Sequence, residues 1–164
     1  MMATPEDQKQ LGNLLRQESD AAAALLAGLR QEHAALRTSN AAAIEHIAAD
    51  KQRWVNELET LAGQHAQILR NAGYPPSQAG LERYITEQDP HGIHGLDALW
   101  QALKTVSMES RRQNQINGGI IALGRMSIQR TLAILRGQSS EQQNYYSASG
   151  TCQADTSSQS LGQA

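Results

Sequence analysis

Apolar residues recur at helical spacing over two long segments in the first half of the chain. In residues 5–38, leucines from Leu11 to Leu36 are separated by Gln, Glu and Arg. In residues 41–71 the positions alternate at threes and fours, and they are Ile47, Lys51, Trp54, Leu58, Leu61, His65 and Ile68. Such spacing places side chains along one side of a helix, and the second series is typical of a coiled-coil seam. Both segments are therefore predicted to be long helices.

Turn and cap residues separate these two helices and end them. Thr4-Pro5 suits a helix start, because Thr can cap the first backbone amides and Pro fits the first helical position. Thr38-Ser39-Asn40 is expected to end the first helix, and the segment Gly73–Pro76 the second. A short connection between two long helices predicts an antiparallel hairpin.

The second half of the chain predicts one short helix and one long helix. Residues 77–88 can form a short helix with Leu81, Tyr84 and Ile85 facing the hairpin. The third long helix is expected over residues 95–136, with Gly137 as its carboxyl-terminal cap. The predicted fold is all-α: a long antiparallel helical hairpin with a third long helix packed along it.

The third long helix carries more apolar surface than one buried side requires. Its apolar positions are Ile116, Ile120, Ile121, Leu123, Met126, Ile128, Leu132 and Leu135. The same stretch contains three glycines, each costing a helix about 1 kcal/mol relative to alanine; they are Gly118, Gly119 and Gly124. Glycines thin a helix and let another backbone or side chain approach closely. From the residues alone, this surface can be the bundle core, a homodimer seam or a binding site for another protein.

Beyond Gly137 the composition changes to Gln, Ser, Asn, Thr and Gly, with almost no aliphatic residue. Such a segment cannot bury enough apolar surface to offset the entropy of ordering it. We therefore expect a three-helix body over residues 1–137 and a disordered tail over residues 138–164. Tyr145 and Tyr146 stand out, because the tail has no core for them to serve.

Composition and charge exclude several classes of protein. The 164 residues carry a net charge of −2, whereas nucleic-acid binders are usually basic. The longest apolar run, Ala21–Leu29, is far shorter than the roughly 20 residues needed to span a membrane. The amino terminus lacks the pattern of a signal peptide, and a single cysteine, Cys152, excludes an internal disulfide framework. These features predict a cytoplasmic protein without membrane insertion.

The chain also lacks a convincing catalytic or metal site. His91 and His94 form the only close histidine pair, with Asp89 and Asp97 as the nearby acids and no cysteine beside them. No serine or cysteine has an identifiable base, and the Gly118-Gly119 pair has neither a strand before it nor Lys-Ser/Thr after it. We expect no catalytic activity, no cofactor and no bound metal. A metal-dependent enzyme using the two histidines is the weakest interpretation.

Four short motifs along the chain resemble those of a known protein family. They are Asn114-Gln115-Ile116-Asn117-Gly118, Ile120-Ile121, the segment Leu132–Gly137, and Tyr146-Ser147-Ala148-Ser149-Gly150. In this order and spacing they resemble the FlgN family, the export chaperones of the bacterial flagellar type III secretion system. The motifs cover about one third of the chain, and the rest agrees in architecture.

The resemblance implies two partners and two sites. FlgN-like chaperones bind an amphipathic carboxyl-terminal segment of the hook-associated proteins FlgK and FlgL on their own carboxyl-terminal helical region, which favours the binding-site interpretation of the third helix. The tyrosine of the tail motif engages the export-gate protein FlhA, and the matching residue here is Tyr146, with Tyr145 and Gly150 beside it. The family often has Leu and Asp where this chain has Tyr145 and Ser149. The competing interpretation is a non-catalytic coiled-coil module that self-associates, and a homodimer fits either function.

Overall fold

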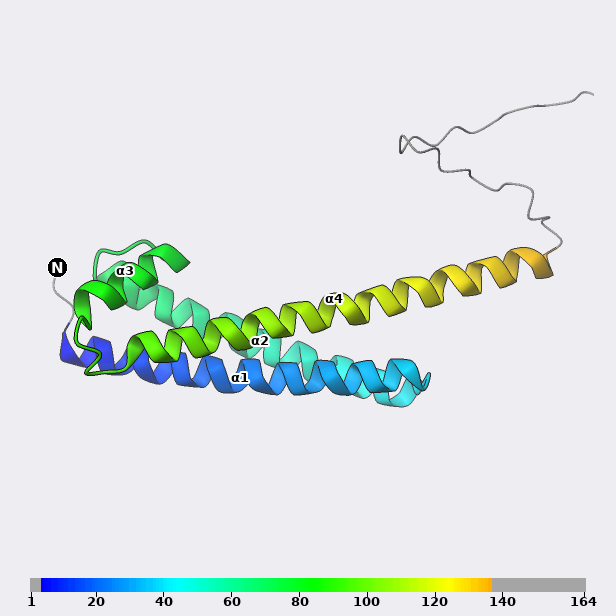
Figure 1. Cartoon of the computed structure of the whole chain (residues 1–164), viewed down its shortest axis with the longest axis horizontal. Coiled ribbons are helices and arrows are strands. Elements are labelled where there is room, and N and C mark those ends of the chain that lie inside the picture. Colours follow the sequence, from blue (N-terminus) through cyan, green and yellow to red (C-terminus); the bar gives the residue numbers. More distant parts are fainter. Residues whose placement is uncertain (1–3, 137–164) are drawn as a thin grey trace, which may run out of the picture. The chain divides into compact units, whose positions relative to one another are not determined.

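The computed structural model describes residues 4–136, which fold into helices without any strand. The helices in this part of the chain are α1 (Pro5–Arg37), α2 (Ala41–Asn71), α3 (Gln78–Gln88) and α4 (Leu96–Leu135) (Figure 1). The all-α prediction is confirmed. Contacts along the backbone divide the chain into unit 1, residues 1–122, and unit 2, residues 123–164, with the boundary inside α4.

Side-chain caps fix where the helices begin. Thr4 and Asp7 form a reciprocal capping box at the start of α1, with the Asp7 amide donating to the Thr4 hydroxyl at 3.2 Å and the Thr4 amide donating to the Asp7 carboxylate at 2.9 Å. Asn40 caps α2 by accepting a bond of 3.1 Å from the Ala43 amide. Ser77 caps α3 in the same way. Each cap satisfies a backbone amide that has no partner within its helix.

Two polar pairs set the register of the α1–α2 hairpin. His65 Nδ1 lies 2.6 Å from Glu18 Oε1, and Lys51 Nζ donates to Glu32 Oε1 at 2.9 Å. The partner of the later residue of α1 is the earlier residue of α2, so the two helices run antiparallel. Lys51 and His65 interrupt the apolar seam of α2 because each faces a buried carboxylate on α1, and a buried carboxylate needs a charged or hydrogen-bonding partner.

Trp54 packs across Gly28 at the middle of the hairpin. A methyl group added at Gly28 would overlap the six-membered ring of Trp54, so the absence of a side chain at this position makes room for the indole. Trp54 therefore fixes the contact between α1 and α2. Trp100, on α4, instead donates from its indole nitrogen to Glu82 of α3 at 3.2 Å.

α3 closes one end of unit 1 over the hairpin. The side chains of Leu81, Tyr84 and Ile85 are buried, as their spacing predicts. Asp89, which follows α3, accepts hydrogen bonds of 3.2 Å from the backbone amides of His94 and Leu96 and so shapes the loop that starts α4. The buried core of unit 1 includes Leu11, Leu14, Leu15, Leu61, Leu69, Leu81, Tyr84, Ile85, Leu96 and Leu103.

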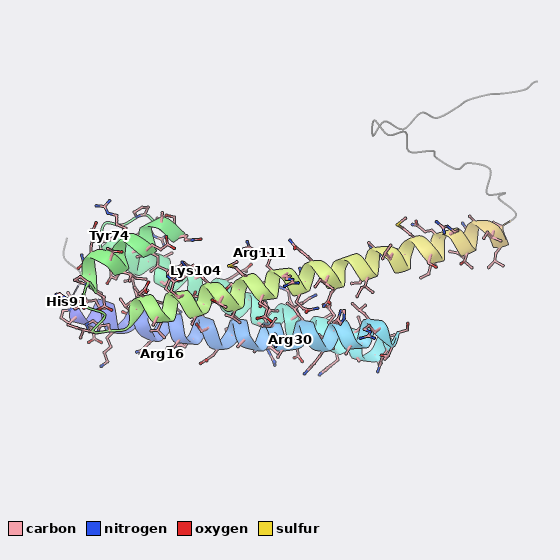
Figure 2. The ribbon with its side chains drawn as sticks, viewed as in Figure 1. Arg16, Arg30, Tyr74, His91, Lys104 and Arg111 are labelled. Atoms are coloured by element: carbon pink, nitrogen blue, oxygen red, sulfur yellow. The ribbon has the colours of Figure 1, made fainter. Side chains whose placement is uncertain are left out.

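In the first part of α4, which belongs to unit 1, the fully buried residues recur at every seventh position. The buried residues of this helix are Leu96, Leu103, Ser110 and Asn117. Arg30 of α1 pairs with Glu109 beside this series, and Lys104 of α4 donates to Glu82 of α3 at 3.1 Å (Figure 2). Of the helices described, none is long and apolar enough to cross a membrane.

Candidate functional site

The environment of α4 changes at Asn117. The buried series starts with leucines, at Leu96 and Leu103, and ends with polar side chains, at Ser110 and Asn117. Asn117 is the last buried residue in the described part of α4. In the described part of unit 2, residues 123–136, every residue except Ala133 is exposed. The candidate site begins where the burial of α4 ends.

A buried polar network holds α4 at this point. The Asn117 side-chain amide donates to Glu32 Oε2 at 2.7 Å and to the Leu29 backbone carbonyl at 2.8 Å. Its own carbonyl oxygen accepts from Gln113 at 3.0 Å. Lys51 of α2 donates to the other oxygen of the same Glu32 carboxylate at 2.9 Å. One carboxylate of α1 therefore joins α2 and α4.

The network fits the chemistry of a buried carboxylate. Glu32 is 3% exposed, so both oxygens have lost most of their water and need donors from the protein. Lys51 supplies a charge-assisted hydrogen bond, and Asn117 supplies a neutral one. Removing Asn117 would leave one oxygen of the buried carboxylate without its donor, which costs about 1–3 kcal/mol. Removing Lys51 would leave the buried charge unpaired, which costs about 3–5 kcal/mol. The network is therefore an anchor for this position of α4.

The predicted partner-binding residues lie mostly on the surface. Ile120 is half-buried, and the other seven are exposed: Ile116, Ile121, Leu123, Met126, Ile128, Leu132 and Leu135. Ile128 is 62% exposed and Leu135 is 77% exposed. Ile116 and Ile121 are therefore exposed within unit 1, whereas the other five exposed residues belong to unit 2. Ile134, which the prediction left out, is also exposed.

The three glycines of α4 are open on the side where a side chain would stand. A methyl group added at Gly118, Gly119 or Gly124 would meet no atom within 4 Å. No other part of residues 4–136 uses the thin surface that these glycines create. The loss of helix stability at these glycines is therefore not offset by closer packing within the described chain. At Gly28, by contrast, the missing side chain makes room for Trp54.

The family motif divides into a buried and an exposed part. Asn117 is buried in the polar network, whereas Asn114, Gln115 and Gly118 are exposed. Tyr145, Tyr146 and Gly150 of the second motif, and the whole segment 137–164, lie outside the described residues.

Unit 1 also contains a groove that sequence reasoning did not find. It encloses a cavity of 460 Å³ between α1, α2 and α4, and its lining is mainly apolar: Ala22, Leu25, Leu29, Ala48, Val55 and Leu58, with Lys51, Gln52, Ser107, Ser110, Arg111 and Asn114. The Ser110 hydroxyl has no hydrogen-bond partner among the described residues. The lining comes from three helices, and only the packing of α4 on the hairpin brings these residues together.

One acidic side chain beside α4, that of Glu82, has a shifted pKa. Trp100 and Lys104 donate hydrogen bonds to Glu82, and these bonds hold the pKa of the Glu82 carboxyl below its ordinary value. His91 and His94 lie in the loop before α4. Within residues 4–136, no group of three or more His, Cys, Asp or Glu side chains is placed to hold a metal ion.

Comparison with protein families finds a match between residues 1–154 and the family described as FlgN protein. The match extends through the four short motifs and through the four described helices. Neither an individual curated protein nor a solved structure matches the chain.

Proposed function

The chain belongs to the FlgN family of flagellar export chaperones, and from this premise we propose that it binds the carboxyl-terminal helical segments of FlgK and FlgL and delivers these proteins to FlhA. In this proposal the protein has no catalytic activity or cofactor of its own and works in the cytoplasm. The exposed apolar series on α4 is the observation that carries the proposal.

The surface of α4 suits recognition of one helix by another. Ile121, Ile128, Leu132 and Leu135 recur at threes, fours and sevens, which is the spacing of anchors in a helix-to-helix interface. Large exposed apolar side chains at such spacing are unfavourable in water unless a partner covers them. A client segment with its own apolar stripe would bury these residues, and the client would be protected from early assembly at the same time.

The tail provides a separate contact in this proposal. Tyr146, with Tyr145 and Gly150, is proposed to dock on the cytoplasmic domain of FlhA. A tyrosine offers a large contact area, few rotatable bonds and one hydroxyl for a directed hydrogen bond. In this proposal the contact with FlhA is weak and reversible, as a delivery step needs.

Calorimetric titration with the carboxyl-terminal segments of FlgK and FlgL tests the client site. We expect saturable one-to-one binding to the full chain, an equal affinity for a chain ending at Gly137, and a large loss in Ile128→Asp. Ile93→Asp is the matched control, because Ile93 is 79% exposed and precedes α4. If neither the full chain nor the chain ending at Gly137 bound the FlgK and FlgL segments, the client assignment would be rejected.

A second titration, with the cytoplasmic domain of FlhA, tests the tail. Tyr146→Ala should impair docking on FlhA and leave client binding unchanged. If Tyr146→Ala also abolished client binding, the division into two sites would be wrong.

Self-association through α4 is the competing function, because a stripe with residues at sevens can also pair with a second copy. Light scattering over a dilution series separates the two. A dimer that persists on dilution and does not bind the FlgK or FlgL segments would favour the structural module.

A further inference from the structure

Along α4, the acidic residues end close to the point where the buried residues end. Between residues 4 and 109 the sequence has fourteen acidic and nine basic side chains. From Ser110 to Arg136 there is no Asp or Glu, and all charged residues are arginines: Arg111, Arg112, Arg125, Arg130 and Arg136. The exposed apolar surface is therefore embedded in a purely cationic stretch of helix.

These arginines have no acidic partner within the described residues. All five are exposed, and within residues 4–136 none of them forms an ion pair with Asp or Glu. Attraction to the negative end of the helix dipole accounts for Arg136, but it decays within the last turn and does not reach Arg125 or Arg130.

Two of the arginines stand inside the apolar stripes of unit 2. Arg125 lies three residues before Ile128 and seven before Leu132, so it shares their side of the helix. On the other side, Arg130 lies four residues after Met126 and four before Ile134. A partner packed on either stripe must place some group opposite an arginine. Among protein side chains, a carboxylate is the group that pairs best with a guanidinium.

We propose that the client segment bound by α4 is an acidic amphipathic helix, with apolar anchors against Ile128 and Leu132 and a carboxylate opposite Arg125. This proposal rests on the function proposed above for α4 and specifies the chemistry of its partner. Arg130, between Met126 and Ile134, offers a second carboxylate site on the opposite side. The arginines then select the client by charge, while the apolar residues supply most of the binding free energy.

A second copy of this chain fits the surface less well. Pairing two α4 segments from residues 123–136 would bring cationic helices together, since each copy has three arginines and no acid there. Like charges across a helical interface destabilise it.

An anionic membrane surface is also a poorer occupant. A helix lying on a membrane has one apolar side and one charged side. Here Leu123 and Ile134 lie roughly 200° around the helix from Ile121, so apolar residues occupy two sides, and each side includes an arginine. A partner helix can supply a carboxylate beside its apolar anchors, whereas a lipid surface would bury the arginine among acyl chains.

The test uses the full-length protein and two synthetic amphipathic helical peptides as probes. The peptides have identical apolar positions, and the flanking positions are all Glu in one and all Lys in the other. By fluorescence anisotropy we expect the Glu peptide to bind at least about tenfold more tightly at low salt, with the preference shrinking as salt screens the charges. Arg125→Gln should weaken binding of the Glu peptide by about threefold to fivefold. Arg37→Gln is the control, because it removes the same charge from an exposed position of α1.

The outcomes separate this inference from the proposed function. Equal binding of the two peptides, or binding of neither, would overturn the acidic-helix proposal. The proposal would also fail if Arg125→Gln weakened binding only to vesicles containing phosphatidylglycerol. If the FlgK and FlgL segments bind with no sensitivity to Arg125→Gln or to salt, the charge inference fails and the chaperone function stands. If the Glu peptide is preferred and Arg125-dependent while those segments do not bind, the charge inference stands and the client assignment fails.

Discussion

The side-chain amide of Asn117 donates a 2.7 Å hydrogen bond to the buried carboxylate of Glu32, eighty-five positions earlier in the sequence. This bond lies at the last buried position of α4, one residue before the pair Gly118-Gly119. Asn117 belongs to the short motif through which the sequence resembles the FlgN family. Part of that motif therefore has a structural role in unit 1, and the exposed part, with Asn114 and Gln115, is left for other contacts.

Replacing Asn117 by alanine should lower the free energy of unfolding by about 2 kcal/mol, because one oxygen of the buried Glu32 carboxylate would lose its donor. Asn117→Asp should be worse, since it places a second carboxylate against the first. Urea denaturation followed by circular dichroism measures both.

Asn114→Ala is the matched control for this prediction. It makes the same substitution on the same helix at an exposed position, so it shares the gain in helix propensity without touching the network. Equal stability of the Asn117→Ala and Asn114→Ala variants would show that the network adds nothing to unit 1.

Tyr84 should make the fold sensitive to alkali. Burial raises the pKa of its phenol from the ordinary value of about 10 to about 12, and the nearby Asp7 carboxylate and Tyr74 add to the rise. A group with a raised folded-state pKa gives a stability contribution that is complete below the unfolded pKa and is lost as pH rises through the folded pKa. The free energy of unfolding should therefore fall between about pH 10 and pH 12.

Tyr84→Phe tests this pH dependence. The variant should lose a part of the alkaline decline of the order of 2 kcal/mol. Near neutral pH it should be at least as stable as the wild type, because the Tyr84 hydroxyl is buried and has no hydrogen-bond partner among the described residues. Urea titrations from pH 8 to pH 12 provide the comparison. An unchanged decline would assign the alkaline sensitivity to other groups.

The helices of this protein follow closely from local sequence. Thr4-Pro5 and Asn40 mark the starts of α1 and α2. The apolar spacing of Leu81, Tyr84 and Ile85 predicts the buried side of α3. Such features are local, because caps and periodicity act within a few residues. The all-α fold could be predicted for this reason.

Contacts between distant helices could not be predicted in the same way. Lys51 and His65 look like faults in an apolar seam until the hairpin register places Glu32 and Glu18 opposite them. The groove around Ser110 likewise depends on the distance between α2 and α4, which no periodicity encodes. For α4, the sequence indicated surplus apolar residues and left core, homodimer seam and partner site open, because the choice depends on what packs against the helix and not on its own periodicity.

Gly28 and Gly63 should respond to alanine in opposite directions. A side chain at Gly28 would push into the ring of Trp54, so Gly28→Ala should destabilise the hairpin by about 1–3 kcal/mol. Gly63 has nothing within 4 Å, and Gly63→Ala should stabilise α2 by about 1 kcal/mol. Urea denaturation of the two variants, and of Gly28→Ala combined with Trp54→Leu, measures the coupling. If Gly28→Ala cost the same in the presence and absence of the indole, Trp54 would not be the cause.

The three open glycines of α4 offer a test of why an exposed helix keeps residues that weaken it. Because no described atom lies near them, Gly118→Ala, Gly119→Ala and Gly124→Ala should each stabilise the free protein by about 0.5–1 kcal/mol. If the glycines let a client helix approach the α4 backbone, the same variants should bind the FlgK and FlgL segments more weakly than wild type does, despite their greater stability. Gly63→Ala controls for stabilisation at a distance. Calorimetry on the three variants decides: a rise in stability with full affinity would mean that the client does not use the thin surface of the helix.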